Sequence, residues 1–563
     1  MKGNSKAIMI LVALAGLVFG ITLLVITLTQ NAGKPDYQIS EENATEIMDR
    51  LYRRIQIKEL PPVRGNAELS EVDLREELPD IDDKYPPLVR ANSDAFIELL
   101  SSVEKATDSA NDRWLLDMAE AFNRSGAVVG GKSASVQLRG IASGAGMDYI
   151  LSGKFVPDAF TPSNELWGDS LVASGIKAVL AEKSLTGNVA GLMLKREKHD
   201  EIVSKYGSIS VKTIIDAVTA GELNFGYTNP FSSSTGANFL LSALYTISPN
   251  DPFSSDAASA FGAFQANIPF VAYTTLQMKE AAKSGALDGF VFSAQQLTSA
   301  PEFRDYIFTP FGERADNPVY AMGDISAEGR EILDLFIAFC KKGDSQDSAT
   351  KLGFNQYSGY ICELSGFSGK DLATAQKFYK EKKNYGRDII AVFIADISGS
   401  MGGAPIMQLK QSLLKASTYI DSNTQIGLVT FSENVNIALP IAPFDINQRS
   451  LFAGAVADMT EGGATAMFDA IVVASKMLQD AKAENPNAKT LLFVLTDGET
   501  NVGATLNDTR AMISGLKTPI YTIGYNEGSS ILPELSLINE AASINADTDD
   551  VVYQLQCLFN AEM

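Results

Sequence analysis

Histidine, cysteine and clustered basic residues are scarce in this 563-residue chain, and each scarcity argues against a class of function. The one histidine, His199, lies in the charged stretch 195–200, so a catalytic Ser-His pair is not indicated. The three cysteines, Cys340, Cys362 and Cys557, have neither metal-type spacing nor the even count of a disulfide framework. A net charge of −22 without a compensating basic block argues against a nucleic-acid partner.

Motifs for catalysis are also missing. The glycine-containing stretch 462–466 lacks the Gly-Lys-Ser/Thr ending of a nucleotide-binding loop. No nucleophile and base occur in a recognisable pattern, although Mg²⁺ with hydroxyl ligands can support phosphoryl chemistry. The sequence therefore predicts a protein that binds rather than an enzyme.

The start of the chain has the composition of a membrane segment. Residues 7–29 form a run of 23 without charge, which is long enough to cross a bilayer as a helix. Lys2 and Lys6 precede the run and acidic residues follow it, so the remainder is expected on the extracytoplasmic side. We predict an uncleaved, single-pass signal anchor in a cell membrane. A cleaved signal peptide is the alternative, although no clear small-x-small cleavage site ends the run.

The rest of the chain divides by composition and pattern. Residues 30–90 are charged and contain several prolines, which predicts a largely extended spacer with a short amphipathic helix near 45–60. Residues 91–342 and 387–563 both alternate apolar strand-like runs with amphipathic helical stretches, which is typical of α/β domains. Residues 343–386 read as a bridge whose basic stretch 371–383 is expected to form a helix joining the two domains.

Oxygen-bearing side chains follow two apolar strand-like runs of the C-terminal domain. Asp396, Ser398 and Ser400 come directly after the run 389–395, and Asp497 follows the run 490–496. Thr465 lies in a glycine-containing loop before a predicted helix. Because ligands gather at the carboxyl ends of strands in such sheets, these side chains are expected to converge. Carboxylate and hydroxyl oxygens are the ligands that hard divalent cations prefer.

This set resembles the metal-ion-dependent adhesion site (MIDAS) of von Willebrand factor type A (VWA, VWFA) domains. The resemblance implies a doubly wound, Rossmann-like sheet in which Asp396, Ser398, Ser400, Thr465 and Asp497 hold Mg²⁺, or another divalent cation such as Mn²⁺ or Ca²⁺. It implies that the serines and threonine ligate directly or through water and that the aspartates hold the water shell. One position is then left open for an Asp or Glu of a protein partner, as expected of an adhesion protein at a cell surface.

The region 91–342 carries serine- and glycine-rich loops where predicted strands meet helices. Such loops present hydroxyls and backbone N–H groups to an anion or polar ligand, or they simply cap the helices. The loops around 101–102, 141–146, 157–167 and 226–236 resemble those of bacterial extracellular solute-binding proteins of the periplasmic type. That resemblance implies two α/β lobes around a ligand cleft. The candidate ligand-binding residues are Ser101, Ser102, Ser143, Asn229, Ser233, Ser234 and Thr235.

Two functions remain open from the sequence. In the first, a membrane-anchored protein captures an acidic group of a protein partner through a metal ion. In the second, the two-lobed region is the receptor for a small anion or polar solute of an ABC-type transporter. The two functions are compatible, because they use different domains.

Overall fold

The protein is described by a computed structural model covering residues 39–545 and Leu555. The gaps are 66–77, 109–111, 269, 273–277, 280–281, 284–286, 363, 365, 385–386, 421, 423, 499, 526–530, 540 and 542. The predicted membrane segment 7–29 lies outside these residues. Within them, no helix combines the length and apolar character needed to span a bilayer.

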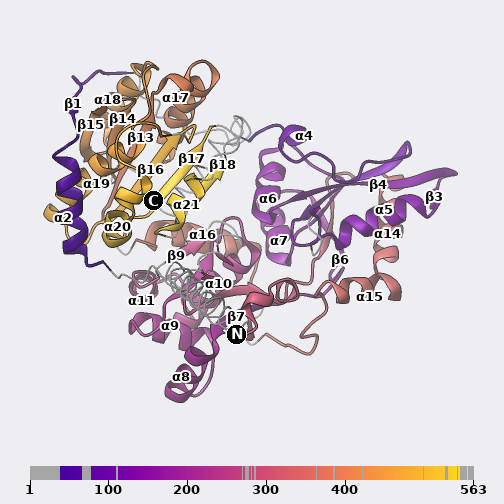
Figure 1. Cartoon of the computed structure of the whole chain (residues 1–563). Helices are drawn as coiled ribbons and strands as arrows, with labels where there is room; N and C mark the ends of the chain where they lie inside the picture. Colours follow the sequence, from indigo (N-terminus) through magenta and orange to yellow (C-terminus); the bar gives the residue numbers. More distant parts are fainter. Residues whose placement is uncertain are drawn as a thin grey trace, which may run out of the picture.

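The C-terminal domain is built on one mostly parallel sheet with helices on both faces (Figure 1). Its strand order is β1-β15-β14-β13-β16-β17-β18, and β15 is antiparallel to β14. The elements are β13 (Ile389–Asp396), β14 (Gln425–Phe431), β15 (Val435–Pro443), β16 (Lys489–Thr496), β17 (Ile520–Gly524), β18 (Ser543–Asn545), α17 (Ala404–Ala416), α18 (Ile446–Ala457), α19 (Met467–Glu484), α20 (Leu506–Leu516) and α21 (Ile531–Leu537).

The central strand β13 shows why this sheet needs cover on both faces. Phe393 and Ala395 join the apolar cluster on one face, whereas Val392 and Ile394 join the cluster on the other. Successive side chains of a strand point to opposite faces, so an uninterrupted apolar run is buried on both. This arrangement agrees with the doubly wound sheet predicted from the sequence.

Residues 39–65 do not form the largely extended spacer that the sequence predicts, because they contain a helix and an edge strand of this sheet. The helix α2 (Glu41–Tyr52) packs against α19 and α20, with Ala44 and Met48 fully buried. The strand β1 (Ile57–Glu59) then extends the sheet as a parallel neighbour of β15 (Figure 1). Residues 39–65 therefore fold onto the C-terminal domain, because the apolar spacing in α2 gives one helix face a surface to bury.

A close backbone approach fixes the end of this docked segment, and it gives a testable prediction. A Cβ atom on Gly454 of α18 would lie 2.1 Å from the carbonyl oxygen of Val63. We expect Gly454→Ala to displace residues 57–65 and to lower stability by about 1–3 kcal/mol, because overpacking forces backbone shifts. Helix propensity alone predicts a gain of about 1 kcal/mol from the same change. The check is hydrogen exchange of the 57–59 amides.

The control for this prediction is Gly343→Ala, since a Cβ atom at Gly343 meets open space. Unchanged exchange at 57–59 in Gly454→Ala would contradict the docking of the segment.

The preceding region forms two lobes, each with its own sheet (Figure 1). Lobe 1 has strand order β3-β4-β2-β5-β12-β6, and lobe 2 has order β11-β7-β10-β8-β9. Lobe 1 contains β2 (Ala95–Ser102), β3 (Val128–Val129), β4 (Lys132–Ile141), β5 (Ala159–Thr161), β6 (Ala178–Glu182), β12 (Val319–Met322), α4 (Ile81–Lys84), α5 (Trp114–Arg124), α6 (Ser143–Ser152), α7 (Glu165–Ala173), α14 (Ala327–Cys340) and α15 (Gly343–Lys351). Lobe 2 contains β7 (Ala190–Lys195), β8 (Phe225–Thr228), β9 (Phe270–Ala272), β10 (Gly289–Ser293), β11 (Tyr306–Phe311), α8 (Arg196–Tyr206), α9 (Val211–Thr219), α10 (Ser234–Ile247), α11 (Ser255–Gln265) and α13 (Ala294–Leu297).

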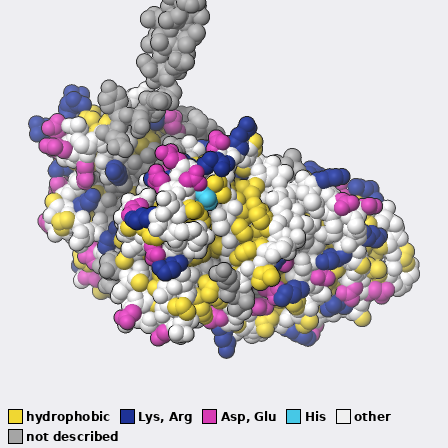
Figure 2. Space-filling model, turned by 90° about the horizontal axis from the view of Figure 1, so that it is seen from below, with side chains coloured by type: hydrophobic (Ala, Val, Ile, Leu, Met, Phe, Trp, Pro, Cys, Tyr) yellow, Lys and Arg dark blue, Asp and Glu magenta, His cyan; other side chains and the backbone are white. Residues whose placement is uncertain are grey.

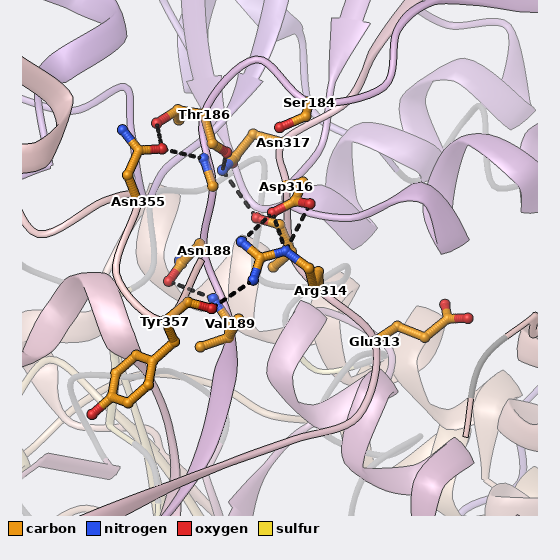
Figure 3. A network of polar contacts seen from close by, with 12 residues as sticks. Ser184, Thr186, Asn188, Val189, Glu313, Arg314, Asp316, Asn317, Asn355 and Tyr357 are labelled. Atoms are coloured by element: carbon orange, nitrogen blue, oxygen red, sulfur yellow. Dashed lines mark hydrogen bonds and ion pairs between the residues drawn. The ribbon is translucent and has the colours of Figure 1, made fainter. Parts of the chain in front are cut away.

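The connections between the lobes are held together by a polar network (Figure 3). Asn317 donates from Nδ2 to the carbonyl of Thr186 at 2.9 Å, which ties the two crossing segments together. Asn355 accepts at Oδ1 from the Gly187 amide at 2.8 Å, so a third segment joins the network. Asn317 and Asn355 both have positive φ, 52° and 61°, a region that asparagine tolerates better than most residues. These hydrogen bonds hold the three connecting segments in fixed positions relative to one another.

The predicted bridging helix is present as α16 (Gly369–Lys382), and it contacts both lobes. It packs against α7 of lobe 1 and against α10 and α11 of lobe 2. Gln376 donates from Nε2 to the Pro230 carbonyl at 2.9 Å, and Tyr245 donates to Asp371 at 3.0 Å. Figure 1 shows α16 at the junction of lobe 2 with the C-terminal domain. The chain thus passes from both lobes into β13.

Candidate metal centre and interlobe cleft

The predicted metal-binding aspartates lie at the same edge of the C-terminal sheet. Asp396 is the last residue of β13, and Asp497 directly follows β16. The two strands are parallel neighbours, with Ala395 opposite Leu495. The 101 positions that separate the aspartates in sequence are therefore bridged by one strand pairing.

The loop after β13 is ordered by its own side chains. Asp396 accepts from the Ser398 amide at 2.7 Å through Oδ1, and from the Thr496 hydroxyl at 2.5 Å through Oδ2. The Ser398 and Ser400 hydroxyls are 3.1 Å apart, which is hydrogen-bond distance. Ser398 is buried, whereas Ser400 is exposed. The two hydroxyls thus lie side by side, with Ser400 on the solvent side.

The loop that carries Thr465 is joined to the first loop through the backbone. The Gly399 amide donates to the Gly463 carbonyl at 3.0 Å, and the Gly462 amide donates to the Ile397 carbonyl at 2.8 Å. Gly463 has φ +85°, and a Cβ atom there would lie 2.7 Å from Glu433 Oε2, so glycine is required. Thr465 is buried, and its amide donates to Asn501 Oδ1 at 2.9 Å. The structure therefore joins the Ser398 loop to the Thr465 loop.

The centre is acidic and buried. Burial raises the pKa of the Asp396 carboxyl to about 6, hydrogen bonds from Thr496 and Ser398 oppose the rise, and the charge of Asp497 adds to it. Asp497 Oδ1 is buried and has no hydrogen-bond partner among the described residues. A buried carboxylate oxygen without a partner is costly unless a cation or water meets it. This orphaned oxygen belongs to the residue that follows β16, at the sheet edge where Asp396 ends β13, and such an oxygen fits a hard divalent cation.

Two residues at this centre were missed in the sequence analysis. Thr496 holds Asp396 in place, and Asn501 holds the Thr465 backbone. Thr496 ends a predicted strand beside Asp497, so its position offered a signal, but Asn501 lies in a loop without one. Among the described residues no group of three or more His, Cys, Asp or Glu is arranged so that it could hold a metal ion. The centre instead combines two carboxylates with neutral hydroxyls.

The predicted ligand-binding residues of the two lobes lie on facing edges. Ser101 and Ser102 end β2, and Ser143 begins α6, both in lobe 1. Ser234 begins α10 in lobe 2, and its hydroxyl reaches Ser143 Oγ at 3.5 Å. Trp167 of lobe 1 donates to the same Ser234 hydroxyl at 2.8 Å. The structure thus brings Ser143 of lobe 1 and Ser234 of lobe 2 together where the lobes meet.

Other predicted cleft residues bond mainly within their own lobe. Ser233 caps α10, and its hydroxyl lies 2.7 Å from Thr228 Oγ1 and 2.9 Å from Thr235 Oγ1. Asn229 uses Oδ1 to accept from the Phe231 amide at 2.9 Å. Ser233 and Thr235 therefore serve the helix cap and the local turn, which is the alternative that the sequence left open.

Further buried polar groups of the two lobes, other than Asn229, were not named from the sequence as candidate ligand-binding residues. Buried side-chain atoms without a hydrogen-bond partner among the described residues occur on both lobes. They include Thr161 Oγ1 and both amide atoms of Asn164 in lobe 1, and Asn229 Nδ2, Ser232 Oγ and Ser293 Oγ in lobe 2. Lys105, fully buried at the end of β2, was missed as well. Thr161 and Asn164 lie in the loop 157–167, and Asn229 and Ser232 lie in the loop 226–236, so the sequence indicated these stretches. Ser293 and Lys105 lie outside the loops that it singled out.

Comparisons with known proteins identify both regions. Residues 391–557 match the sequence profile of the von Willebrand factor type A domain, and residues 107–355 match that of bacterial extracellular solute-binding proteins. Inter-alpha-trypsin inhibitor heavy chain H3 of Bos taurus is 32% identical over 174 residues, which is 28% of this chain and 19% of that protein. Heavy chain H4 of Homo sapiens is 29% identical over 181 residues, 29% of this chain and 19% of that protein. The chain thus spans about a fifth of the length of these curated relatives.

Solved structures show likenesses to each part. A von Willebrand factor type A protein from Catenulispora acidiphila is similar at 20% identity and a TM-score of 0.29, over 31% of this chain and 43% of that one. Iron-bound HitA from Pseudomonas aeruginosa is similar at 15% identity and a TM-score of 0.36, over 52% of this chain and 99% of that one. The chain combines a region of the bacterial extracellular solute-binding protein type with a C-terminal von Willebrand factor type A domain.

Proposed function

We propose that this chain is an extracytoplasmic binding protein whose C-terminal domain captures an acidic group of a protein partner through a divalent cation. The observation that carries the proposal is the unpartnered, buried Asp497 Oδ1, whose residue follows β16 at the sheet edge where β13 leads into the Ser398–Ser400 hydroxyl pair. Asp396, Ser398, Ser400, Thr465 and Asp497 would hold the cation, with Mg²⁺ preferred by their oxygen chemistry and Mn²⁺ or Ca²⁺ as substitutes.

The residues of the site favour binding over catalysis. A cation held largely by neutral hydroxyls keeps enough positive charge to attract a carboxylate from outside. The protein's own residues orient the site, since Thr496 fixes Asp396 and Asn501 fixes the Thr465 backbone. Ser400 is exposed, so its side of the centre is open to a partner.

The test uses the full chain extracted from membranes with detergent, so that it also examines the proposed single-pass anchor at residues 7–29. We expect a protein partner to be captured from a membrane fraction in Mg²⁺ and released by EDTA. Ser400→Ala should abolish capture, because it removes one oxygen from the centre, and should weaken Mn²⁺ binding measured by electron paramagnetic resonance. Recovery of the chain in the soluble fraction without detergent would contradict the anchor.

The matched control is Asp480→Asn, which removes an exposed carboxylate on α19 that pairs with Lys476. This variant should keep both capture and Mn²⁺ binding. Capture that persists in EDTA, or that survives Ser400→Ala, would contradict the metal-dependent mode.

A second function, reception of a small solute between the lobes, rests on a different observation. Buried polar atoms without a hydrogen-bond partner among the described residues occur in both lobes. Buried polar groups are normally satisfied, so a cluster of exceptions indicates a place for water or a ligand. Figure 2 shows acidic and basic side chains interspersed over one face of the molecule.

A further inference from the structure

An exposed glutamate lies against the junction of the two loops that form the candidate metal centre. Glu433 is in the turn between β14 and β15, and a Cβ atom at Gly463 would lie 2.7 Å from its Oε2. The Gly463 carbonyl accepts at 3.0 Å from the amide of Gly399, the residue between the two serines of the centre. The Glu433 carboxylate therefore lies where the serine loop joins the threonine loop.

A second exposed glutamate contacts the serine loop from another side. Glu461 directly precedes Gly462, whose amide donates to the Ile397 carbonyl at 2.8 Å. A Cβ atom at Gly402 would lie 3.6 Å from Glu461 Cγ and 4.0 Å from Glu461 Oε1. Gly402 is two residues beyond Ser400, the exposed hydroxyl of the centre. A second carboxylate therefore borders the loop whose hydroxyl is open to solvent.

The surroundings of the centre offer no basic residue to neutralise these carboxylates. The loops that carry or border the candidate ligands contain acidic residues but no lysine, arginine or histidine, and they are 397–403, 432–434, 458–466 and 497–505. Within the described part of the chain, neither Glu433 nor Glu461 forms an ion pair. The solvent side of the centre therefore carries negative charge around the place proposed for the cation.

Charge decides which acidic groups can approach such a centre. The cation attracts one carboxylate, whereas Glu433 and Glu461 repel further negative charges that arrive beside it. Like charges that face each other across an interface are unfavourable, and opposite charges speed association and fix the orientation of the partner. The buried, unpartnered Asp497 Oδ1 is an independent sign that a cation belongs at this sheet edge.

We infer that the protein partner presents its Asp or Glu between basic residues, so that the carboxylate meets the cation while flanking Lys or Arg side chains pair with Glu433 and Glu461. This inference rests on the proposed function and adds the chemistry of the partner surface. It makes a run of acidic residues a poor partner, although each of its carboxylates could ligate a cation.

The experiment measures binding of the full chain, in detergent and saturating Mg²⁺, to immobilised short peptides by surface plasmon resonance. The peptides have blocked ends and differ in their central residues, which are Lys-Asp-Lys, Ser-Asp-Ser, Glu-Asp-Glu or Lys-Asn-Lys. We expect Lys-Asp-Lys to bind about fivefold tighter than Ser-Asp-Ser, because two exposed ion pairs form. Glu-Asp-Glu should bind more weakly than Ser-Asp-Ser. Lys-Asn-Lys should show no Mg²⁺-dependent binding, because it lacks the carboxylate.

A double variant, Glu433→Gln with Glu461→Gln, locates the preference. It should bind Lys-Asp-Lys and Ser-Asp-Ser equally in Mg²⁺, because both changes remove exposed charges and neither residue is a candidate metal ligand. The matched control is Glu484→Gln, which removes an exposed carboxylate at the last residue of α19, about 25 Å along the helix from the end nearest Thr465. This control should keep the preference for Lys-Asp-Lys.

The outcomes separate this inference from the function on which it rests. Equal binding of Lys-Asp-Lys and Ser-Asp-Ser by the original protein, with both lost in EDTA, would overturn the inference and leave metal-dependent capture standing. A preference for Lys-Asp-Lys that survives in the double variant would also overturn it. Binding of the Asp peptides that persists in EDTA would contradict both. If no Asp peptide binds, the inference fails, and capture from the membrane fraction decides the proposed function separately.

Discussion

Asp497→Asn is expected to abolish stabilisation of the C-terminal domain by Mg²⁺ while leaving the metal-free protein as stable as, or more stable than, the original. In the absence of a cation, two buried carboxylates share one edge of the sheet; burial is the main cause of the raised pKa of Asp396, and the charge of Asp497 adds to it. Asp497 Oδ1 also lacks a partner within the described residues. The amide removes the repulsion between like charges, which is worth about 1 kcal/mol per pKa unit.

In saturating Mg²⁺ the order of stability should be reversed, with the original protein more stable than Asp497→Asn. A ligand that binds only the folded state at a hundred times its dissociation constant stabilises by about 2.7 kcal/mol. For a domain of this size that raises the melting temperature by about 5–10 °C. Calorimetry with and without saturating Mg²⁺ measures this shift, and the Asp497→Asn variant should show none of it.

Asp480→Asn is again the matched control, because it removes a carboxylate from the same domain at an exposed site on α19. An equal Mg²⁺ shift in Asp497→Asn and in the original protein would show that the cation binds elsewhere.

The convergence of the two candidate aspartates was predictable because both follow strand ends. The runs 389–395 and 490–496 are apolar enough to be recognised as buried strands, and parallel strands bring their carboxyl ends together. The sequence therefore named Asp396, Ser398, Ser400, Thr465 and Asp497, and the structure pairs the two strands and bonds the Ser398 loop to the Thr465 loop. Cation binding itself stays a prediction.

Only some of the buried polar residues of the two lobes were named from the sequence. Ser143 and Ser234 were named, since both lie in serine-rich loops at helix starts. Lys105 and Asn164 were not, because burial of a single lysine or asparagine is known only from the fold. Which residues become buried depends on the pairing of strands that lie far apart in sequence. Local composition does not predict that pairing.

The docked segment 39–65 was missed for a related reason. Its charged residues and prolines dominate the composition, whereas its burial depends on a few residues such as Ala44 and Met48. The three-residue strand β1 forms because the edge of β15 is available to pair with it. Tertiary contact thus gives structure to a stretch whose own composition is typical of a spacer.

Lys105 also makes the stability of lobe 1 depend on pH. Its pKa falls from 10.5 to about 7 on folding. Between those values the unfolded chain holds a proton that the folded chain lacks, so stability rises with pH through that window. Below pH 7 both states are protonated and the full burial penalty, on the order of 5 kcal/mol, remains. Lobe 1 should therefore be more resistant to urea at pH 9 than at pH 6.

Lys105→Met should remove this dependence and stabilise lobe 1 at pH 6, with a net gain of about 2–4 kcal/mol after the loss of its two hydrogen bonds. Tryptophan fluorescence is a selective probe, because the chain has two tryptophans, Trp114 and Trp167, and both are buried in lobe 1. Lys132→Met should keep the original pH profile. A lower urea midpoint for Lys105→Met at pH 6 would instead show that the two hydrogen bonds of the lysine outweigh the cost of burying its charge.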